Sequence, residues 1–177
     1  QLAEMRAAFG LDRHWTIAYA EWMARILRGD LGTSLRQRTP VAGLILDALG
    51  PTLLLSVTSI LLAYALSIPL GLYAAHRSGK PDERALTALL YILYSFPSYV
   101  VAIFLLLYFS VKLGWLPVFG MRGSDYEELS MAGQVWDLAQ HMVLPVTCYT
   151  YGALAYSTRF IRSNIAEVYS QDYIRTA

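Results

Sequence analysis

The sequence predicts an all-α protein, a polytopic bundle of helices with three membrane-spanning segments. Two observations predict this class. Hydrophobic residues make up 56% of the 177 residues and charged residues only 15%, so the chain is more apolar than an ordinary soluble domain. The charges are also segregated, because no Asp, Glu, Lys or Arg occurs in residues 52–75 or 85–111. A soluble helix of that length needs a charged outer face, and these segments have none.

We predict spans over about 52–75, 85–111 and 142–158. The first has 24 residues, which cover roughly 36 Å as a helix and can cross a hydrocarbon core of about 30 Å with some tilt. The third is short and contains Thr and Tyr side chains. It is still predicted as a span because His141 and Arg159 flank it and because helices inside a membrane bundle tolerate polar residues.

Each predicted span contains one proline, namely Pro69, Pro97 and Pro145. Neighbouring helices in a membrane bundle can satisfy the carbonyls that proline leaves free, so kinked spans are expected there. Kinks suit a protein that moves, but they also occur in static bundles.

The segment before the first span, residues 1–51, is amphipathic. Trp15, Tyr19, Trp22 and Ile26 recur at helical spacing, which predicts a helix that lies on the membrane surface or packs on a neighbouring helix. Gly29-Asp30-Leu31-Gly32 is expected to end it. Thr39-Pro40 then predicts the start of a short helix, which we expect Gly50-Pro51 to end.

The distribution of positive charge predicts the orientation. Residues 76–84 and 159–177 hold six of the Lys and Arg residues in 28 positions, whereas the remaining eight are spread over the 81 positions of the other side. Because positive residues concentrate in short cytoplasmic loops, residues 76–84 and 159–177 are expected to be cytoplasmic. Residues 1–51 and 112–141 are then extracytoplasmic.

No catalytic constellation, metal-ligand cluster or phosphate-binding glycine loop is visible, and no cofactor is expected. The net charge of +1 without a basic patch gives no reason to expect nucleic-acid binding. Cys148 is the only cysteine and is expected to be a small buried side chain. No ionisable Asp, Glu, Lys or Arg lies inside a predicted span, which disfavours a proton-driven carrier. If the protein transports a solute, we expect the energy to come from elsewhere.

The tail from Arg159 to Ala177 allows two interpretations. Ser163 or Asn164 could cap a separate helix that docks on a soluble partner, or the tail could be a cytoplasmic extension of the third span. The chain begins with Gln1 and stops at Ala177 within a helical pattern, so we expect an internal fragment of a longer protein.

An ordered series of motifs covers nearly the whole chain. Its members are Phe9-Gly10-Leu11-Asp12 with Trp22, Gly29-Asp30-Leu31-Gly32-Thr33-Ser34, Thr52-Leu53 with Ile68-Pro69-Leu70-Gly71, Ser95-Phe96-Pro97-Ser98, Leu113-Gly114-Trp115-Leu116-Pro117, His141-Met142-Val143-Leu144-Pro145, and Arg159 and Arg162 leading into Gln171-Asp172-Tyr173-Ile174-Arg175-Thr176-Ala177. In this order the series resembles the permease subunit of binding-protein-dependent ABC importers, in the branch that serves dipeptides, oligopeptides and, in some members, nickel.

The resemblance implies a type I ABC importer permease fold, with residues 52–177 an incomplete permease domain in the cytoplasmic (inner) membrane of a bacterium or archaeon. It implies a pathway for peptides and no enzymatic activity of the chain itself. The expected partners are a homologous second permease, two cytoplasmic ABC ATPase subunits, an extracytoplasmic solute-binding protein and the lipid bilayer. A permease for nickel or another small solute is the alternative.

The resemblance also implies site residues. The start of an EAA-like loop, which couples such permeases to their ATPases, is expected at Glu167, Asp172, Tyr173, Arg175, Thr176 and Ala177. Polar side chains inside the spans are candidates for lining the pathway, with helix packing as the alternative for each. They are Ser67, Ser95, Ser98 and Thr147.

Two other classes of protein fit parts of the sequence. A membrane-embedded enzyme would need converging ionisable or metal-binding residues at membrane depth, and none are visible. A structural membrane subunit without transport activity fits the composition equally well, but the ordered motifs favour the transporter.

Overall fold

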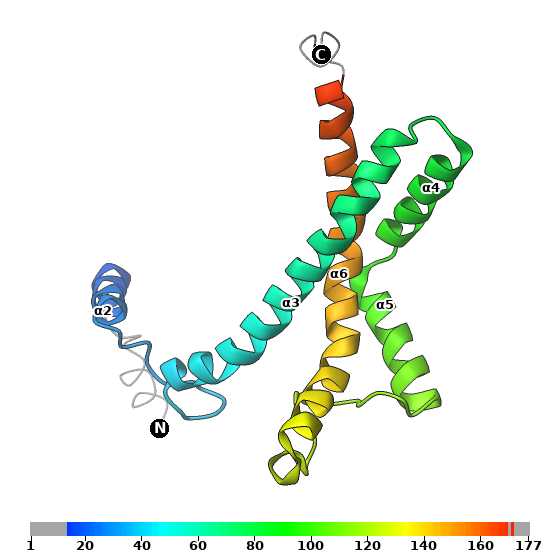
Figure 1. Ribbon diagram of the computed structural model, residues 1–177. Coiled ribbons are helices and arrows are strands. Elements are labelled where there is room, and N and C mark those ends of the chain that lie inside the picture. Colours follow the sequence, from blue (N-terminus) through cyan, green and yellow to red (C-terminus); the bar gives the residue numbers. More distant parts are fainter. Residues whose placement is uncertain (1–13, 170, 172–177) are drawn as a thin grey trace. The chain divides into compact units, whose positions relative to one another are not determined.

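The computed structural model describes residues 14–169 and 171 of the chain. Every regular element among these residues is a helix, and the only β-type pairing among them is an isolated bridge between Thr33 and Pro40. The predicted all-α class is therefore confirmed. The chain divides into two compact units, Gln1–Gly50 and Pro51–Ala177, which are described separately (Figure 1).

The first unit contains α2, Trp15–Leu27. Its aromatic side chains are exposed and none of its residues is buried, so the helix covers no core within the unit. Two glycines follow it with φ of 81° at Gly29 and 73° at Gly32, a left-handed conformation that costs glycine little. The Gly32 amide donates to the Asp30 carboxylate at 2.9 Å. The prediction that this glycine pair ends the helix is confirmed.

Helix α3 runs without interruption over Val41–His76. The prediction that Gly50-Pro51 ends a short separate helix is therefore wrong. Proline removes one backbone donor and clashes with the carbonyl four residues before it. Within an apolar segment, however, leaving the helix would free several more backbone groups with no water to satisfy them. Pro51 and Pro69 thus both lie inside α3.

Most of α3 beyond Pro51 carries large apolar side chains that remain exposed, as at Ile60, Leu61 and Tyr64. An exposed apolar surface of this length is unfavourable in water, but lipid or further helices can cover it. By length and apolarity α3 qualifies as a membrane span. It contains the whole of the predicted first span.

The second predicted span is broken. It consists of α4, Pro81–Ser95, and α5, Ser98–Leu105, and a π-helical segment, η1, continues α5 over Leu106–Lys112. The two halves together have the length and apolarity of a span but meet at 91°. The prediction of one helix over 85–111 is corrected, because the residue before a proline avoids the helical region and Phe96 is extended at φ −82°, ψ 128°.

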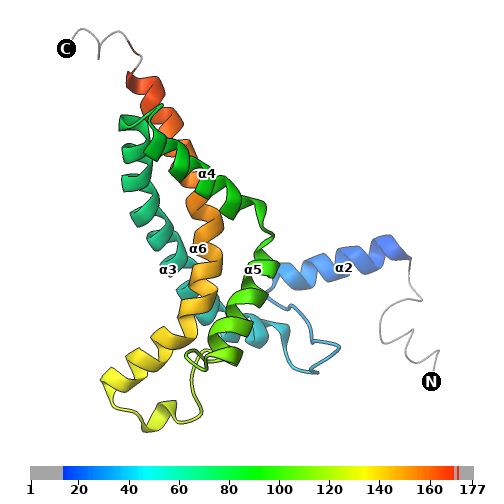
Figure 2. The ribbon, with the colours of Figure 1, turned by 90° about the vertical axis from the view of Figure 1, so that its right-hand side faces the viewer.

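A loop with one 3₁₀ turn, η2 (Tyr126–Glu128), leads to α6, Met131–Tyr169. The predicted third span lies in the middle of this helix of 39 residues. Helix α6 does not reach the apolarity of α3, so a span over 142–158 stays a prediction. Views from two sides show α4 and α5 beside α6 (Figures 1 and 2).

Helix α6 continues into the tail as far as Tyr169, so no new helix begins in residues 159–169. Ser163 and Asn164 are not N-caps, since both side chains donate to the Phe160 carbonyl from within the helix, at 2.9 and 3.0 Å. For residues 159–169, the structure shows an extension of the helix that contains the third predicted span.

Small side chains form a stripe on the face of α3 that packs on α6. They recur every four residues and all are buried, so they lie on one face of the helix. A Cβ on Gly71 would lie 2.7 Å from Ile161 Cγ2, and the Thr150 hydroxyl donates to the Ser59 carbonyl at 3.4 Å. Such residues let helix backbones approach closely in membrane bundles. The stripe consists of Ser59, Ala63, Ser67, Gly71 and Ala75.

Candidate functional site

Three polar groups meet where α3 turns into α4. The Arg77 guanidinium donates to the Asp82 carboxylate at 2.7 Å, and the Tyr73 hydroxyl donates to the same oxygen. These two donors, Arg77 foremost, hold the pKa of the Asp82 carboxyl well below its usual range. Asp82 also stands in the first turn of α4, where a negative charge is favoured by the helix dipole. The turn between α3 and α4 is therefore fixed by charge.

The next residue, Glu83, is buried and connects α4 to α6. Its side chain is only 4% exposed and its carboxylate lies 2.9 Å from the guanidinium of Arg162 on α6. The Thr87 hydroxyl donates to it at 2.7 Å and the Gly79 amide at 3.3 Å. A buried carboxylate is costly unless it is paired and hydrogen-bonded, and Glu83 meets both conditions.

Two further contacts join α4 to α6. The Arg159 guanidinium lies over the rings of Tyr91 and Tyr94, 5.0 and 5.3 Å from their centroids, within the range of cation–π attraction. At the break in the span, the Tyr151 hydroxyl donates to the Phe96 carbonyl at 3.1 Å. Helix α6 thereby satisfies a backbone acceptor at the place where α4 ends.

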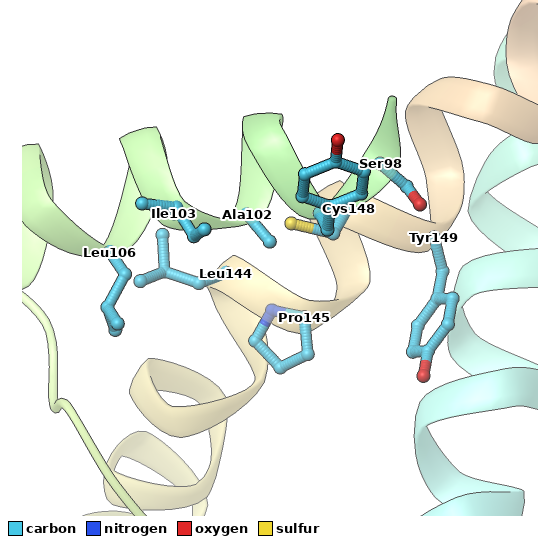
Figure 3. A pocket seen from close by; sticks show the side chains of 9 residues that line it. Ser98, Ala102, Ile103, Leu106, Leu144, Pro145, Cys148 and Tyr149 are labelled. Atoms are coloured by element: carbon cyan, nitrogen blue, oxygen red, sulfur yellow. The ribbon is translucent and has the colours of Figure 1, made fainter. Parts of the chain in front are cut away.

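Beyond the break, α5 and α6 enclose a groove of about 480 Å³ (Figure 3). Apolar atoms form nearly all of its lining. The polar side chains that line it are Ser98, Tyr99 and Tyr149, together with the thiol of Cys148. Among the described residues, no hydrogen bond or ion pair joins α5 to α6. The two halves of the broken span are therefore held to α6 in different ways, α4 by charges and hydrogen bonds and α5 by apolar contact.

Asp137, in the second turn of α6, fixes the loop that precedes this helix by a hydrogen bond. Its carboxylate accepts the Gly123 amide at 2.9 Å, and His141 Nδ1 lies 2.8 Å from its carbonyl oxygen and 3.5 Å from its carboxylate. The side chain of His141 is 5% exposed. His141 thus has the contacts of a structural residue.

The four candidate pathway residues lie in different environments. Ser67 is completely buried in the stripe on α3, and its hydroxyl has no hydrogen-bond partner. Ser95 and Thr147 are exposed, and each donates to a carbonyl four residues back in its own helix, at 2.8 and 2.7 Å. Ser98 lines the groove. A pathway role for all four stays a prediction.

Of the predicted coupling segment, the structure describes Glu167, near the end of α6. The other members, Asp172, Tyr173, Arg175, Thr176 and Ala177, lie outside the described residues.

Sequence reasoning missed Glu83, Arg162 and Tyr151 as contacts between helices. A signal was present for Glu83, an acid that borders an uncharged stretch within a basic loop. Its partner lies 79 positions further along the chain, and a single sequence does not pair positions that far apart. Among the described residues, no group of three or more His, Cys, Asp or Glu side chains could hold a metal ion.

Residues 67–177 match the family model described as "Binding-protein-dependent transport system inner membrane component". The chain is 35% identical over 170 residues to the oligopeptide transport system permease protein AppB of Bacillus subtilis, which covers 96% of this chain and 52% of AppB. It is 33% identical over 176 residues to the probable peptide ABC transporter permease protein y4tP of Sinorhizobium fredii, which covers 99% of this chain and 54% of y4tP.

The glutathione transport system permease protein GsiC of Salmonella paratyphi A is 33% identical over 177 residues, or 99% of this chain and 53% of GsiC. The chain thus spans about half the length of the curated relatives that it matches. The family match contains α4, α5, α6 and the ion pair between Glu83 and Arg162. The chain belongs to the family of binding-protein-dependent transport system inner membrane components.

Proposed function

We propose that the complete protein is the membrane-spanning subunit of an ATP-driven importer and forms the pathway for di- and oligopeptides. The observation that carries the proposal is the family match over 67–177, together with relatives whose names specify oligopeptide, peptide and glutathione transport. The exposed apolar face of α3 supports the placement in a membrane. The family is one of transporter permeases, and such a subunit is not itself an enzyme.

The predicted spans contain no Asp, Glu, Lys or Arg, which supports an energy source outside them. We assign ATP hydrolysis to two cytoplasmic ATPase subunits and substrate delivery to a solute-binding protein, with a homologous second permease completing the pathway. The protein crosses the inner membrane several times, with residues 76–84 and 159–177 on the ATPase side. The concentration of Lys and Arg in these two segments supports that orientation.

The direct test is transport by the reconstituted complex. The complete permease is placed in liposomes with its partner subunits, and the solute-binding protein and a labelled dipeptide or tetrapeptide are added outside, with ATP inside. We expect uptake that requires both ATP and the binding protein. Calorimetry of the binding protein with peptides and with Ni²⁺ identifies the substrate class. Uptake of Ni²⁺ in place of peptide would refute the peptide assignment, and no ATP-dependent uptake of either would refute the importer.

The coupling segment is tested separately in the same complex. Replacing Asp172 or Tyr173 with Ala is expected to abolish the stimulation of ATP hydrolysis by loaded binding protein. Glu128→Ala is the matched control, because it also removes a carboxylate but from an exposed position in the loop before α6. If the Asp172 and Tyr173 variants keep normal stimulation, residues 172–177 do not couple the permease to its ATPases.

A further inference from the structure

Helix α4 contacts α6 along its whole length through polar groups. Glu83 at its first turn pairs with Arg162, the Tyr91 and Tyr94 rings near its end face Arg159, and the carbonyl that follows it accepts from Tyr151. The three contacts differ in type, but each has a directional or charged component. Together they fix the position of α4 along α6 and its rotation about its own axis.

The contact at Glu83 is the best shielded of the three. The Glu83 side chain is 4% exposed, and Thr87 and Gly79 donate to the same carboxylate. The Arg162 side chain is 33% exposed, so the buried member of the pair is Glu83. Removing Arg162 leaves the Glu83 carboxylate buried without its counter-charge, which is unfavourable. A movement of the α6 tail that left α4 behind would have the same effect, so the pair resists separation of the two helices.

The restraint ends at the break. Pro97 interrupts the span, and its two halves, α4 and α5, meet at 91°. Beyond the break, α5 faces α6 across a groove whose lining is almost entirely apolar. Apolar contact is not directional, so it permits α5 to shift against α6 at lower cost than α4. The segment between Ser95 and Ser98 is then the place where a movement of α4 can be taken up by a change of backbone angles.

We propose that the ion pair between Glu83 and Arg162 makes α4 and the tail half of α6 one rigid body, so that Glu83 and Arg162 are positioning residues for energy coupling. The inference builds on the proposed function. A displacement of the α6 tail by the ATPases carries α4 and the turn before it along, and the break passes the movement to α5. The ATPase-driven motion thus reaches α4 and α5 as well as α6.

The first experiment uses the complete importer in liposomes and measures the ratio of peptide taken up to ATP hydrolysed. This ratio does not depend on how much of a variant folds. Glu83→Gln and Arg162→Gln are expected to lower it about fivefold or more, the lower range of coupling energies between distant sites. Arg162→Lys keeps the charge and should retain more coupling than Arg162→Gln. Arg84→Gln, which removes an exposed charge next to Glu83, is the control and should leave the ratio unchanged.

The second experiment distinguishes a rigid body from a latch that opens during the cycle. Glu83→Cys and Arg162→Cys are combined in a protein with Cys148→Ala, and the two thiols are joined with a short bifunctional methanethiosulfonate reagent. The same protein without the introduced cysteines controls for the reagent. We expect the cross-linked importer to take up more peptide per ATP than the unlinked double variant, and reduction to abolish the gain.

Inhibition of uptake by the cross-link, reversed by reduction, would show that the two helices separate during transport and would overturn the inference. A ratio in Glu83→Gln and Arg162→Gln equal to that of the unaltered importer would also overturn it. If the unaltered complex shows no uptake, it is the proposed function that fails.

Discussion

The close approach of α3 and α6 at Gly71 can be tested by adding a single methyl group. A Cβ at this position would lie 2.7 Å from Ile161 Cγ2, 2.8 Å from Ile161 Cβ and 3.1 Å from the Thr158 carbonyl oxygen, whereas ordinary contact begins at 3.4 Å. Rotation of the Ile161 side chain could move Cγ2 away. It cannot move Cβ, which is attached to the backbone, so the two helices must separate locally by about 0.6 Å.

Gly71→Ala should lower the free energy of unfolding, because the packing penalty exceeds the gain in helix propensity. Forcing an extra methyl group into a packed contact typically costs about 1–3 kcal/mol, and a gap of about 0.5–1 Å removes a quarter to a half of each neighbouring dispersion contact. In the opposite direction, Gly→Ala inside a helix gains about 1 kcal/mol. The difference between the two terms predicts that Gly71→Ala destabilises the protein by up to about 2 kcal/mol, which appears as a lower Tm.

The assay is thermal unfolding of the detergent-purified complete protein, followed by the loss of the monodisperse peak in size-exclusion chromatography. Gly152→Ala is the matched control, since Gly152 lies inside α6 with nothing within 4 Å of an added Cβ, and it should be neutral or raise Tm. If Gly71→Ala were as stable as Gly152→Ala, the close helix contact would not exist and the reasoning would be refuted.

Three further substitutions probe single polar groups by the same thermal assay. Tyr151→Phe removes the donor to the Phe96 carbonyl and should cost about 0.6 kcal/mol, the average for hydrogen bonds between membrane helices, and at most about 1.7 kcal/mol. Tyr156→Phe, at an exposed tyrosine, is its control, and equal Tm values would contradict the role of the Tyr151 hydroxyl. Ser67→Ala removes a buried hydroxyl without a partner and should leave Tm unchanged or raise it; a clear loss would show that the hydroxyl has a partner in the complete protein. Asp82 has a lowered pKa, so its ionised form stabilises the fold above the ordinary pKa of about 3.9, and this contribution is lost as pH falls towards the lowered value. Asp82→Asn should therefore lower Tm by the same amount from pH 5 to pH 8 and by less below about pH 4, and a deficit that does not shrink in acid would contradict the assignment.

The helical class and the positions of α2 and α3 could be predicted because they depend on local patterns. The aromatic spacing from Trp15 to Ile26 and the glycines after it determine α2 without reference to the rest of the chain. The uncharged stretch 52–75 likewise identifies the apolar part of α3. Helix ends at proline were less predictable. Pro51 lies inside a helix, whereas Pro97 stands at a break of 91°.

Pro51 and Pro97 differ in the contacts that surrounding segments make with the backbone near them. A single sequence does not show such contacts. Helix α5 starts directly after Pro97. The Tyr151 hydroxyl of α6 donates a hydrogen bond to the Phe96 carbonyl, which the end of α4 leaves without a helical partner. The pairing of Glu83 with Arg162 was unpredictable for the same reason, since it depends on which helices pack together. The motifs predicted the family correctly because they preserve local sequence. They gave no information on contacts between helices.

The length of α6 has a consequence for how signals cross this subunit. Its 39 residues extend about 58 Å as a regular helix, nearly twice the thickness of a hydrocarbon core of about 30 Å. One continuous helix therefore joins the loop before Met131 to the residues beyond Arg162. Thermodynamic linkage is reciprocal. A ligand that binds at the loop end and favours one position of this helix must therefore gain affinity from any event at the other end that favours the same position, to the same extent in free energy.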